Sequence, residues 1–247
     1  MAQDEIITAA VLVIGDEILS GRTKDQNIST IAVHLTAIGI ALREVRIVGD
    51  EEGAIVAAVN VLRERYTYVF TTGGIGPTHD DITADSIGAA FGVAVDIDPR
   101  AVAVMAPAYA ARGIELTPAR LRMARIPSGA DLIINSMSAA PGFKLGNVIV
   151  MAGVPDIMRS MLVAVTNQLR TGPKVNSVSI VVARAEGEIA DLFAAHQRAY
   201  PDVAMGSYPS FSEGQYRTEL VLRGADADRL EEARVGLARM LAERELS

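Results

Sequence analysis

The sequence contains no cysteine and no tryptophan, and aromatic residues make up only 4% of it. The lack of cysteine excludes disulfides, thiolate metal sites and cysteine nucleophiles, and it agrees with a reducing compartment. No hydrophobic run reaches the roughly 18 residues that a membrane helix needs, so we expect no membrane span. The first residues are acidic rather than basic, which argues against a secretory signal. We therefore expect a cytoplasmic protein.

Positive charge is also scarce, because 23 Lys and Arg stand against 30 Asp and Glu, for a formal net charge of −7. An acidic chain with few aromatic residues is poorly suited to nucleic acid, whose binding depends on phosphate neutralisation and base stacking. A small anionic ligand is still compatible, because helix N-termini supply a local positive field. We expect a small-molecule ligand, no nucleic acid and no membrane partner.

Half of the residues are hydrophobic, and strand-like and helix-like patterns alternate through the first half of the chain. Residues 6–14, 41–50 and 66–72 are predicted strands, and the segments between them have helical spacing. A further strand is predicted at 148–151, followed by an amphipathic helix. This order predicts an α/β fold, a mostly parallel sheet with helices on both faces in three α/β/α layers.

The pattern restarts after "TGPK", which is typical of a linker. Beyond it, the segments follow the order β-α-β-β-α, as in a small α+β domain. We therefore predict two domains, residues 1–170 and residues 174–247.

The most distinctive motif is "FTTGGIGPTHDDITADS", which lies between a predicted strand and a predicted helix. Ligands of open α/β sheets bind at the carboxyl ends of the strands. Glycines let backbone N–H groups approach a phosphate closely, and hydroxyls add further donors. The motif therefore predicts a substrate-binding loop made of Thr72, Gly73, Gly74, Gly76 and Thr78. The alternative is an ordinary strand-to-helix turn.

Two adjacent acids, Asp80 and Asp81, follow in the same motif. One of them can cap the helix that begins near Thr83, and a second carboxylate exceeds what capping requires. Paired acids beside a phosphate loop suit Mg²⁺ or a similar hard cation. We therefore predict that Asp80 and Asp81 hold a divalent metal.

The stretch "VIGDEILSGRTKDQN" also follows a predicted strand and is rich in oxygen ligands. Parallel strands bring their carboxyl ends to one edge, so this loop is expected to face the first one. The candidate residues are Asp16, Glu17, Asp25 and Asn27. The alternative is a solvated loop with an Asx cap on the next helix.

A third loop, "MAGVPD", lies between the strand at 148–151 and a helix. Gly153 and Pro155 predict a rigid turn that passes close to another group. On its own this turn would be read as structural. As a third loop at the same sheet edge, it becomes a candidate for substrate binding.

These loops, together with "RMARIPSGADLIINSMSAAPGF", resemble the molybdopterin-binding (MoaB/Mog-like) superfamily. Within it, the sequence is most similar to the N-terminal region of the competence/damage-inducible CinA family. The resemblance covers about residues 6–170, and "EGEIA" with "YPDVAMGSYP" extends it into the second domain. It implies a MoaB/Mog-like domain with a pterin- or nucleotide-binding edge, and a homo-oligomer, a dimer or a trimer.

The resemblance also implies roles for two acids. In the adenylyltransferase branch, the aspartate of the Gly-Gly-x-Gly motif is essential for transferring AMP to molybdopterin, and Asp81 matches it. Asp25 falls where that branch has another acidic residue. In the CinA-like branch, the implied activity is metal-dependent hydrolysis of a pyrophosphate bond, as in ADP-ribose. A related domain of eukaryotic FAD synthases is associated with FAD hydrolysis.

Two features depart from the family pattern. The usual Leu-Pro-Gly-x-Pro reads Val-Met-Ala-Gly-Val-Pro here, with Ala152 in place of the first proline. The sequence also has no counterpart of the amidohydrolase domain of full-length CinA proteins. Deamidation of nicotinamide mononucleotide is therefore not expected.

We predict a nucleotide pyrophosphatase that depends on Mg²⁺, Mn²⁺ or Co²⁺, a hydrolase of phosphoanhydride bonds. Its predicted catalytic residues are Asp81, Asp80 and Asp25. One alternative is molybdopterin adenylylation in molybdenum cofactor biosynthesis, with molybdopterin as ligand or substrate. A second is a non-catalytic pterin- or nucleotide-binding protein. The paired acids argue against the second, because binding phosphates alone would favour Lys and Arg.

Overall fold

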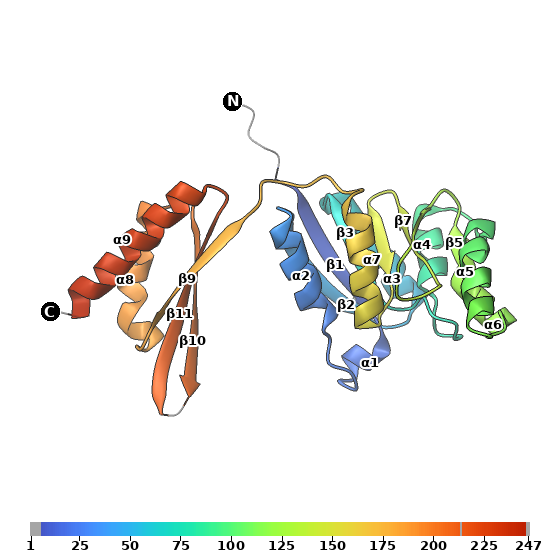
Figure 1. The fold of residues 1–247 in the computed structure, drawn as a ribbon, viewed down its shortest axis with the longest axis horizontal. Coiled ribbons are helices and arrows are strands. Elements are labelled where there is room, and N and C mark those ends of the chain that lie inside the picture. Colours follow the sequence, from blue (N-terminus) through green and yellow to red (C-terminus); the bar gives the residue numbers. More distant parts are fainter. Residues whose placement is uncertain (1–5, 213, 246–247) are drawn as a thin grey trace. The chain divides into compact units, whose positions relative to one another are not determined.

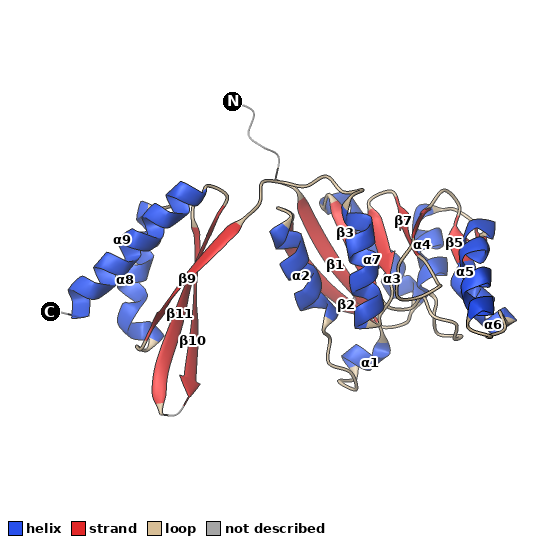
Figure 2. Ribbon diagram, in the orientation of Figure 1, coloured by secondary structure: helices blue, strands red, loops and turns tan. Residues whose placement is uncertain are grey.

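The computed structural model describes residues 6–212 and 214–245 (Figures 1 and 2). Residues 1–5, which open the first predicted domain, lie outside the described residues. The chain divides into two compact units, the first running to Gly172 and the second beginning at Pro173. Each unit is described by itself below.

A six-stranded sheet forms the centre of the first unit, in the order β2-β1-β3-β8-β7-β6. Strands β2, β1, β3 and β8 run parallel, and β7 is antiparallel to both of its neighbours. The bounds are β1 Thr8–Ile14, β2 Ala41–Val48, β3 Tyr68–Thr72, β6 Asp131–Ile133, β7 Gly142–Leu145 and β8 Val148–Met151.

Helices cover both faces of this sheet (Figure 1). Helices α2 (Asn27–Ala37) and α7 (Pro155–Thr166) lie on one side, and α3 (Glu52–Arg65) and α4 (Thr83–Phe91) lie on the other. Because successive side chains of a strand point to opposite faces, every residue from Ala9 to Ile14 is buried. Leu12 and Ile14 pack into the same core as Ile55 of α3. The predicted three-layer, mostly parallel fold is confirmed.

A peripheral segment follows α4 in the first unit. Strands β4 (Val95–Ile97) and β5 (Arg125–Pro127) form a two-stranded antiparallel sheet. Helices α5 (Pro99–Ala111) and α6 (Pro118–Leu121) and the 3₁₀ turn η1 (Arg122–Ala124) connect them. Helix α5 begins at the Asp98-Pro99 pair, where the Asp98 carboxylate accepts a hydrogen bond from the Arg100 amide at 2.7 Å.

The second unit is a small α+β domain with the order β-α-β-β-α, as the fold class predicts. Its antiparallel sheet has the order β10-β11-β9, with β9 Asn176–Val182, β10 Ala204–Ser212 and β11 Gln215–Gly224. Helices α8 (Glu186–Ala199) and α9 (Ala227–Glu245) pack on this sheet. The core gathers residues from all of these elements, among them Val182, Ile189, Leu220 and Leu237. Among the described helices of the whole chain, none is both long and apolar enough to cross a membrane.

Candidate functional site

Four loops meet at the carboxyl edge of the first sheet, because β1, β2, β3 and β8 are parallel. The β3 and β8 loops approach each other closely. The Gly73 amide donates to the Met151 carbonyl at 3.2 Å. Gly73 has φ 108°, and a Cβ there would overlap the Ile14 carbonyl oxygen. A Cβ on Gly153 would lie only 3.3 Å from the Gly73 Cα. Only glycine suits Gly73, where the chain turns over the end of β1.

The Asp81 carboxylate organises the glycine-rich loop from within. One oxygen accepts the Gly76 amide at 2.6 Å, and the other accepts the amide and the hydroxyl of Thr78 at 2.8 and 2.6 Å. A Cβ on Gly76 would lie 2.6 Å from an Asp81 oxygen, so the carboxylate fits only beside a glycine. Asp81 therefore holds the loop in one shape.

The prediction that an aspartate caps α4 is wrong. Its N-cap is Ile82, which makes no side-chain capping bond. The helix start is held instead by Thr83, whose hydroxyl donates to the Gly73 carbonyl at 2.9 Å and whose amide donates to the Gly74 carbonyl at 3.0 Å. This arrangement leaves both aspartates outside the helix and in the loop.

Between Gly73 and Pro77, two backbone amides have no acceptor among the described residues. Gly73 N–H and Gly76 N–H are bound within the chain, and Pro77 has no N–H. Among the described residues, nothing accepts a hydrogen bond from the amides of Gly74 and Ile75. These are the donors that remain for an anionic ligand.

Asn27 ties three of the loops together and is only 5% exposed. Its amide group donates to the Thr72 hydroxyl at 2.7 Å and to the Gly153 carbonyl at 2.8 Å, while Thr72 donates to the Ala152 carbonyl at 2.9 Å. Asp25 accepts the Ile28 amide at 2.8 Å, which is the Asx cap of the alternative interpretation. The candidate residues Asp25 and Asn27 therefore anchor the loop that follows β1.

Two cavities collect most of the predicted residues. A cavity of about 390 Å³ is lined by Glu17, Gly73, Gly74, Gly76, Asp81 and Gly153, among others. A second, of about 190 Å³, is lined by Glu17, Asp25, Asn27, Thr72, Gly153 and Pro155, among others. Because Glu17 and Gly153 line both, the cavities adjoin. Asp16, Thr78 and Asp80 line neither of these two cavities.

Comparison with known proteins identifies the family. Residues 10–171 match the family described as a probable molybdopterin binding domain, and residues 174–247 match the middle domain of FAD synthase. The chain belongs to the molybdopterin-binding domain family. The resemblance expected from the loop motifs is thereby confirmed.

Relatives of this family agree with the match. A protein from Pyrobaculum arsenaticum is 34% identical over 246 residues, covering 96% of this chain and 92% of its own length. A CinA-like protein from Geobacter sulfurreducens is 36% identical over 180 residues, covering 70% of this chain. The aligned part is 44% of that relative's length. The crystal structure of CinA from Thermoplasma acidophilum, a protein of unknown function, superposes with a TM-score of 0.60 at 36% identity, covering 65% of this chain and 96% of that one.

The motif analysis of this family member missed Asp50, which follows β2. The Asp50 carboxylate accepts the Asp16 amide at 3.0 Å, and the Asp16 carboxylate accepts the Asp50 amide at 3.4 Å. Burial raises the pKa of Asp50, and the nearby carboxylates of Asp16, Glu17 and Asp80 raise it further. The signal was present, because "IGDE" after β1 and "VGDE" after β2 repeat the same strand–Gly–Asp–Glu pattern.

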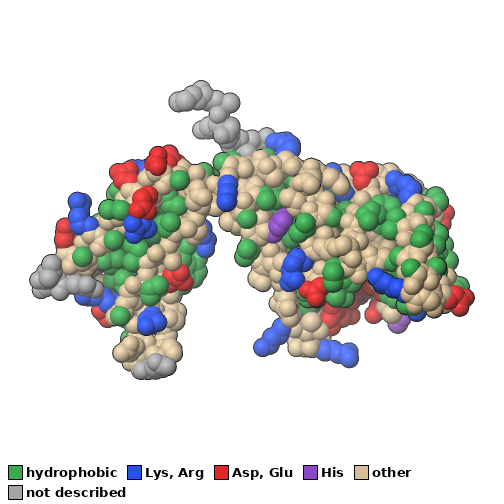
Figure 3. Space-filling view, viewed as in Figure 1, with side chains coloured by type: hydrophobic (Ala, Val, Ile, Leu, Met, Phe, Trp, Pro, Cys, Tyr) green, Lys and Arg blue, Asp and Glu red, His purple; other side chains and the backbone are tan. Residues whose placement is uncertain are grey.

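Asp16, Glu17 and Asp80 are exposed to solvent, and Asp50 is half-buried. On the face shown in Figure 3, acidic side chains line the lower edge of the first unit, near several Lys and Arg side chains. The Asp80 side chain is 61% exposed, with the His79 ring 3.8 Å away. The Thr78 hydroxyl and the Asp80 amide hold the pKa of Asp80 below its usual value. Asp80 is therefore charged at neutral pH and open to solvent.

The acids do not form a closed metal cage. Within residues 6–212 and 214–245, no three His, Asp or Glu side chains lie close enough together to hold a metal ion. Asp81 already accepts three hydrogen bonds, whereas Asp80 is available. Such a donor set fits Mg²⁺, which keeps several waters and takes one or two carboxylates plus substrate phosphates. The metal roles of Asp80 and Asp81 stay predictions.

Proposed function

We propose that this protein hydrolyses the phosphoanhydride bond of a nucleotide pyrophosphate of the ADP-ribose or FAD class, with a divalent cation. The observation that carries the proposal is the β3 loop, which offers two amides without an acceptor in the described part of the chain, beside a cavity of about 390 Å³ lined by the carboxylates of Glu17 and Asp81. The match of the second unit to the middle domain of FAD synthase supports a nucleotide substrate.

The amides of Gly74 and Ile75 would bind the phosphates. Asp81 would keep these amides oriented toward the phosphates, because it fixes the shape of the loop. A divalent cation carried in by the phosphates would neutralise developing charge and make a water more acidic. Asp80 is the exposed carboxylate available to hold it.

A water would attack one phosphorus, the bridging P–O bond would break, and AMP would leave with the second phosphate on the other product. Asp25 is suited to orient this water. One of its oxygens accepts the Ile28 amide, and the other has no partner among the described residues. It also lines the cavity that adjoins the glycine-rich loop. The proton of the water would pass to this carboxylate and then to solvent.

Molybdopterin adenylylation is the second candidate, and the family match favours it. The same loop would bind the phosphates of ATP, and a pterin phosphate would replace water as the nucleophile. A non-catalytic pterin- or nucleotide-binding protein is the third. Product analysis separates the three.

The test is turnover of ADP-ribose, FAD, NAD and ATP by the purified protein with Mg²⁺, Mn²⁺ or Co²⁺. We expect AMP from ADP-ribose or FAD. Asp81→Asn should lower turnover about 100-fold or more, because Asn has only one acceptor oxygen, so its NH2 group would face either the Gly76 amide or the Thr78 amide and hydroxyl. The fold should remain, since the loop is partly exposed.

Asp156→Asn is the matched control. This exposed aspartate of α7 pairs with Arg159 at 2.8 Å and lines neither cavity. We expect it to have wild-type turnover. Full activity in Asp81→Asn would contradict the proposal. No turnover of any substrate would also contradict it, and product formation from ATP with molybdopterin would then favour adenylylation.

A further inference from the structure

Three arginines lie close together in the sequence, Arg120 in α6, Arg122 in η1 and Arg125 in β5, and two of them have partners. Arg125 pairs with Asp85 at 2.6 Å. Arg120 donates to the Glu115 carbonyl at 2.5 Å and lies over the Tyr109 ring, 5.6 Å from its centroid. Arg122 differs from both. Among the described residues, nothing accepts a hydrogen bond from its guanidinium and no carboxylate pairs with it.

Part of the Arg122 guanidinium is buried. The Nε atom of Arg122 is buried and has no partner in the described part of the chain. A buried N–H without an acceptor is costly, and native proteins rarely retain one without a reason. The side chain as a whole is half-buried, so its outer nitrogens can still reach a ligand.

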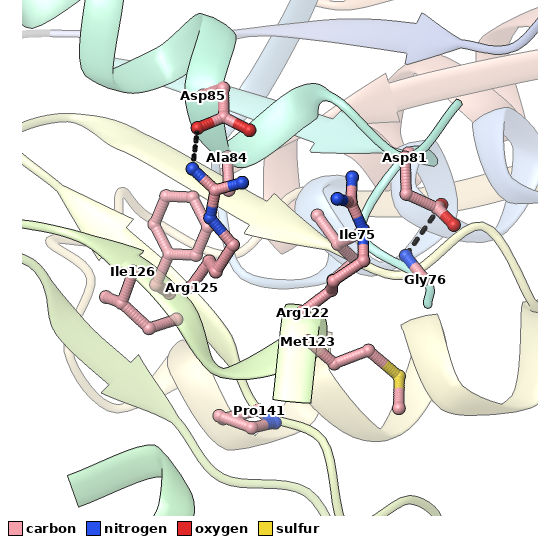
Figure 4. Close-up of a pocket in the computed structure, with 12 residues that line it drawn as sticks. Ile75, Gly76, Asp81, Ala84, Asp85, Arg122, Met123, Arg125, Ile126 and Pro141 are labelled. Atoms are coloured by element: carbon pink, nitrogen blue, oxygen red, sulfur yellow. Dashed lines mark hydrogen bonds and ion pairs between the residues drawn. The ribbon is translucent and has the colours of Figure 1, made fainter. Parts of the chain in front are cut away.

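Arg122 extends toward the glycine-rich loop. In Figure 4 its guanidinium points to the side of the site where Ile75, Gly76 and Asp81 lie, whereas Arg125 turns to Asp85. Arg122 lines a small cavity together with Gly74, Ile75, Gly76, Asp81 and Met123. Those five residues also line the cavity of about 390 Å³. The guanidinium is therefore a neighbour of the two unpartnered amides.

The donors at this point outnumber the acceptors that the chain supplies. The amides of Gly74 and Ile75 and the Arg122 guanidinium have no acceptor within the described residues, and both oxygens of Asp81 are occupied by the loop itself. A guanidinium is always charged, weakly hydrated and shaped to bind two oxygens of a phosphate. An anion with several oxygen acceptors satisfies all of these groups at once.

We propose that Arg122 binds a phosphate group of the substrate together with the amides of Gly74 and Ile75, and so selects ligands that carry a diphosphate. This inference rests on the proposed function in one respect, that the substrate phosphates bind at the amides of Gly74 and Ile75. Among the described residues that line this small cavity, Arg122 supplies a positive charge that no carboxylate pairs with, whereas Arg125 pairs with Asp85.

The test is isothermal titration calorimetry of the full chain with inorganic pyrophosphate, ADP-ribose and adenosine, each with Mg²⁺ and with EDTA. The variants are Arg122→Gln, Arg122→Lys and the control Arg120→Gln. Arg120→Gln removes an equal charge two residues away and leaves both cavities untouched. Melting temperatures verify that each variant is folded.

Arg122→Gln should weaken pyrophosphate and ADP-ribose about 10- to 100-fold, the value of a hydrogen bond to a charged group. Binding of adenosine should not change. Arg122→Lys should recover part of the loss, and Arg120→Gln should bind like the wild type. Equal weakening in Arg120→Gln and Arg122→Gln would overturn the assignment, because it would show a general charge effect. Unchanged binding in Arg122→Gln would overturn it as well, and so would a wild type that binds neither phosphate ligand.

Failure of the proposed function has a different signature. A wild type that binds ADP-ribose through Arg122 but never cleaves it would refute hydrolysis and support the assignment of Arg122. Cleavage that is lost in Asp81→Asn and unaffected in affinity or rate by Arg122→Gln would support hydrolysis and refute the assignment.

Discussion

The two units treat their buried polar groups differently. In the second unit, His196 binds the Ala233 carbonyl at 2.8 Å and Thr218 binds the Arg184 carbonyl at 2.8 Å, so both side chains are satisfied. The buried side-chain atoms without a partner among the described residues are Asn27 Oδ1, Thr71 Oγ1 and Arg122 Nε, all in the first unit. Each such group costs about 1–3 kcal/mol unless a ligand or water meets it. The first unit therefore has spare binding capacity, and the second is built as a closed core.

The largest effect should come from Gly76→Ala in the first unit. The added Cβ would lie 2.6 Å from an Asp81 oxygen, so the carboxylate and the loop that it holds must move. We expect turnover of ADP-ribose or FAD to fall about 100-fold or more, as when a preorganised donor is removed. Stability should change little, because the loop is not part of the core.

Gly53→Ala is the matched control for this substitution. Gly53 lies in α3 and a Cβ there meets nothing within 4 Å. The change should stabilise the protein by about 0.5–1 kcal/mol through the unfolded state and leave turnover alone. Equal activity in Gly76→Ala and Gly53→Ala would show that the shape of the loop does not matter for function.

In the first unit, the sequence predicted the position of the glycine-rich loop but not the contacts that hold its shape. The β3 loop was recognisable because glycines and acids interrupt an apolar pattern in a few consecutive residues. The hydrogen-bond partners of Asp81 were not recognisable from the sequence. A short carboxylate can either cap a helix or accept hydrogen bonds within a loop, and the two cases differ only in backbone geometry. Asp81 braces Gly76 and Thr78 and leaves Ile82 as the helix cap.

Arg122 and Asp50 could not be assigned a role from their local sequence. Arg122 stands among other arginines, and only the fold shows that Arg120 and Arg125 are occupied. Asp50 follows a strand whose neighbour in the sheet was not known. Once β1 and β2 are adjacent, the repeated Gly-Asp-Glu motifs face each other. Order along the chain predicts the layers, whereas pairing between distant segments determines the site.

A smaller effect is expected in the second unit, from His196→Ala. His196 is 3% exposed, stacks on Tyr200 at 4.7 Å between centroids and joins α8 to α9 through Ala233. Its loss should destabilise this unit by about 2 kcal/mol, from a missing hydrogen bond and a cavity. Hydrogen exchange of amides in residues 173–245 would measure it.

Turnover of folded His196→Ala should equal that of the wild type, and Arg198→Ala, an exposed position of the same helix, should change neither property. A loss of turnover in His196→Ala without faster amide hydrogen exchange would contradict this difference between the two units. It would mean that the second unit contributes directly to catalysis.

The smallest effect is expected from Asp50→Asn. This substitution tests whether repulsion among the carboxylates near Asp50 lowers the stability of the first unit. Burial and the carboxylates of Asp16, Glu17 and Asp80 raise the pKa of Asp50. A raised pKa means that the folded state favours the protonated acid. The stability from this group is present below the usual Asp value of about 3.9 and is lost as pH rises through the folded pKa.

At pH 7 the ionised Asp50 is therefore unfavourable, and Asp50→Asn should raise the melting temperature by about 1–3 °C. The Asn oxygen can still accept the Asp16 amide, so that hydrogen bond is retained. The gain should shrink as pH falls through the raised pKa of folded Asp50, and it should be gone below the usual Asp value of about 3.9. Mg²⁺ should raise the melting temperature of the wild type more than that of Asp50→Asn, because the cation relieves the same repulsion. A lower melting temperature of Asp50→Asn at pH 7 would show that the charge of Asp50 stabilises the protein, and it would contradict the expected repulsion between these carboxylates.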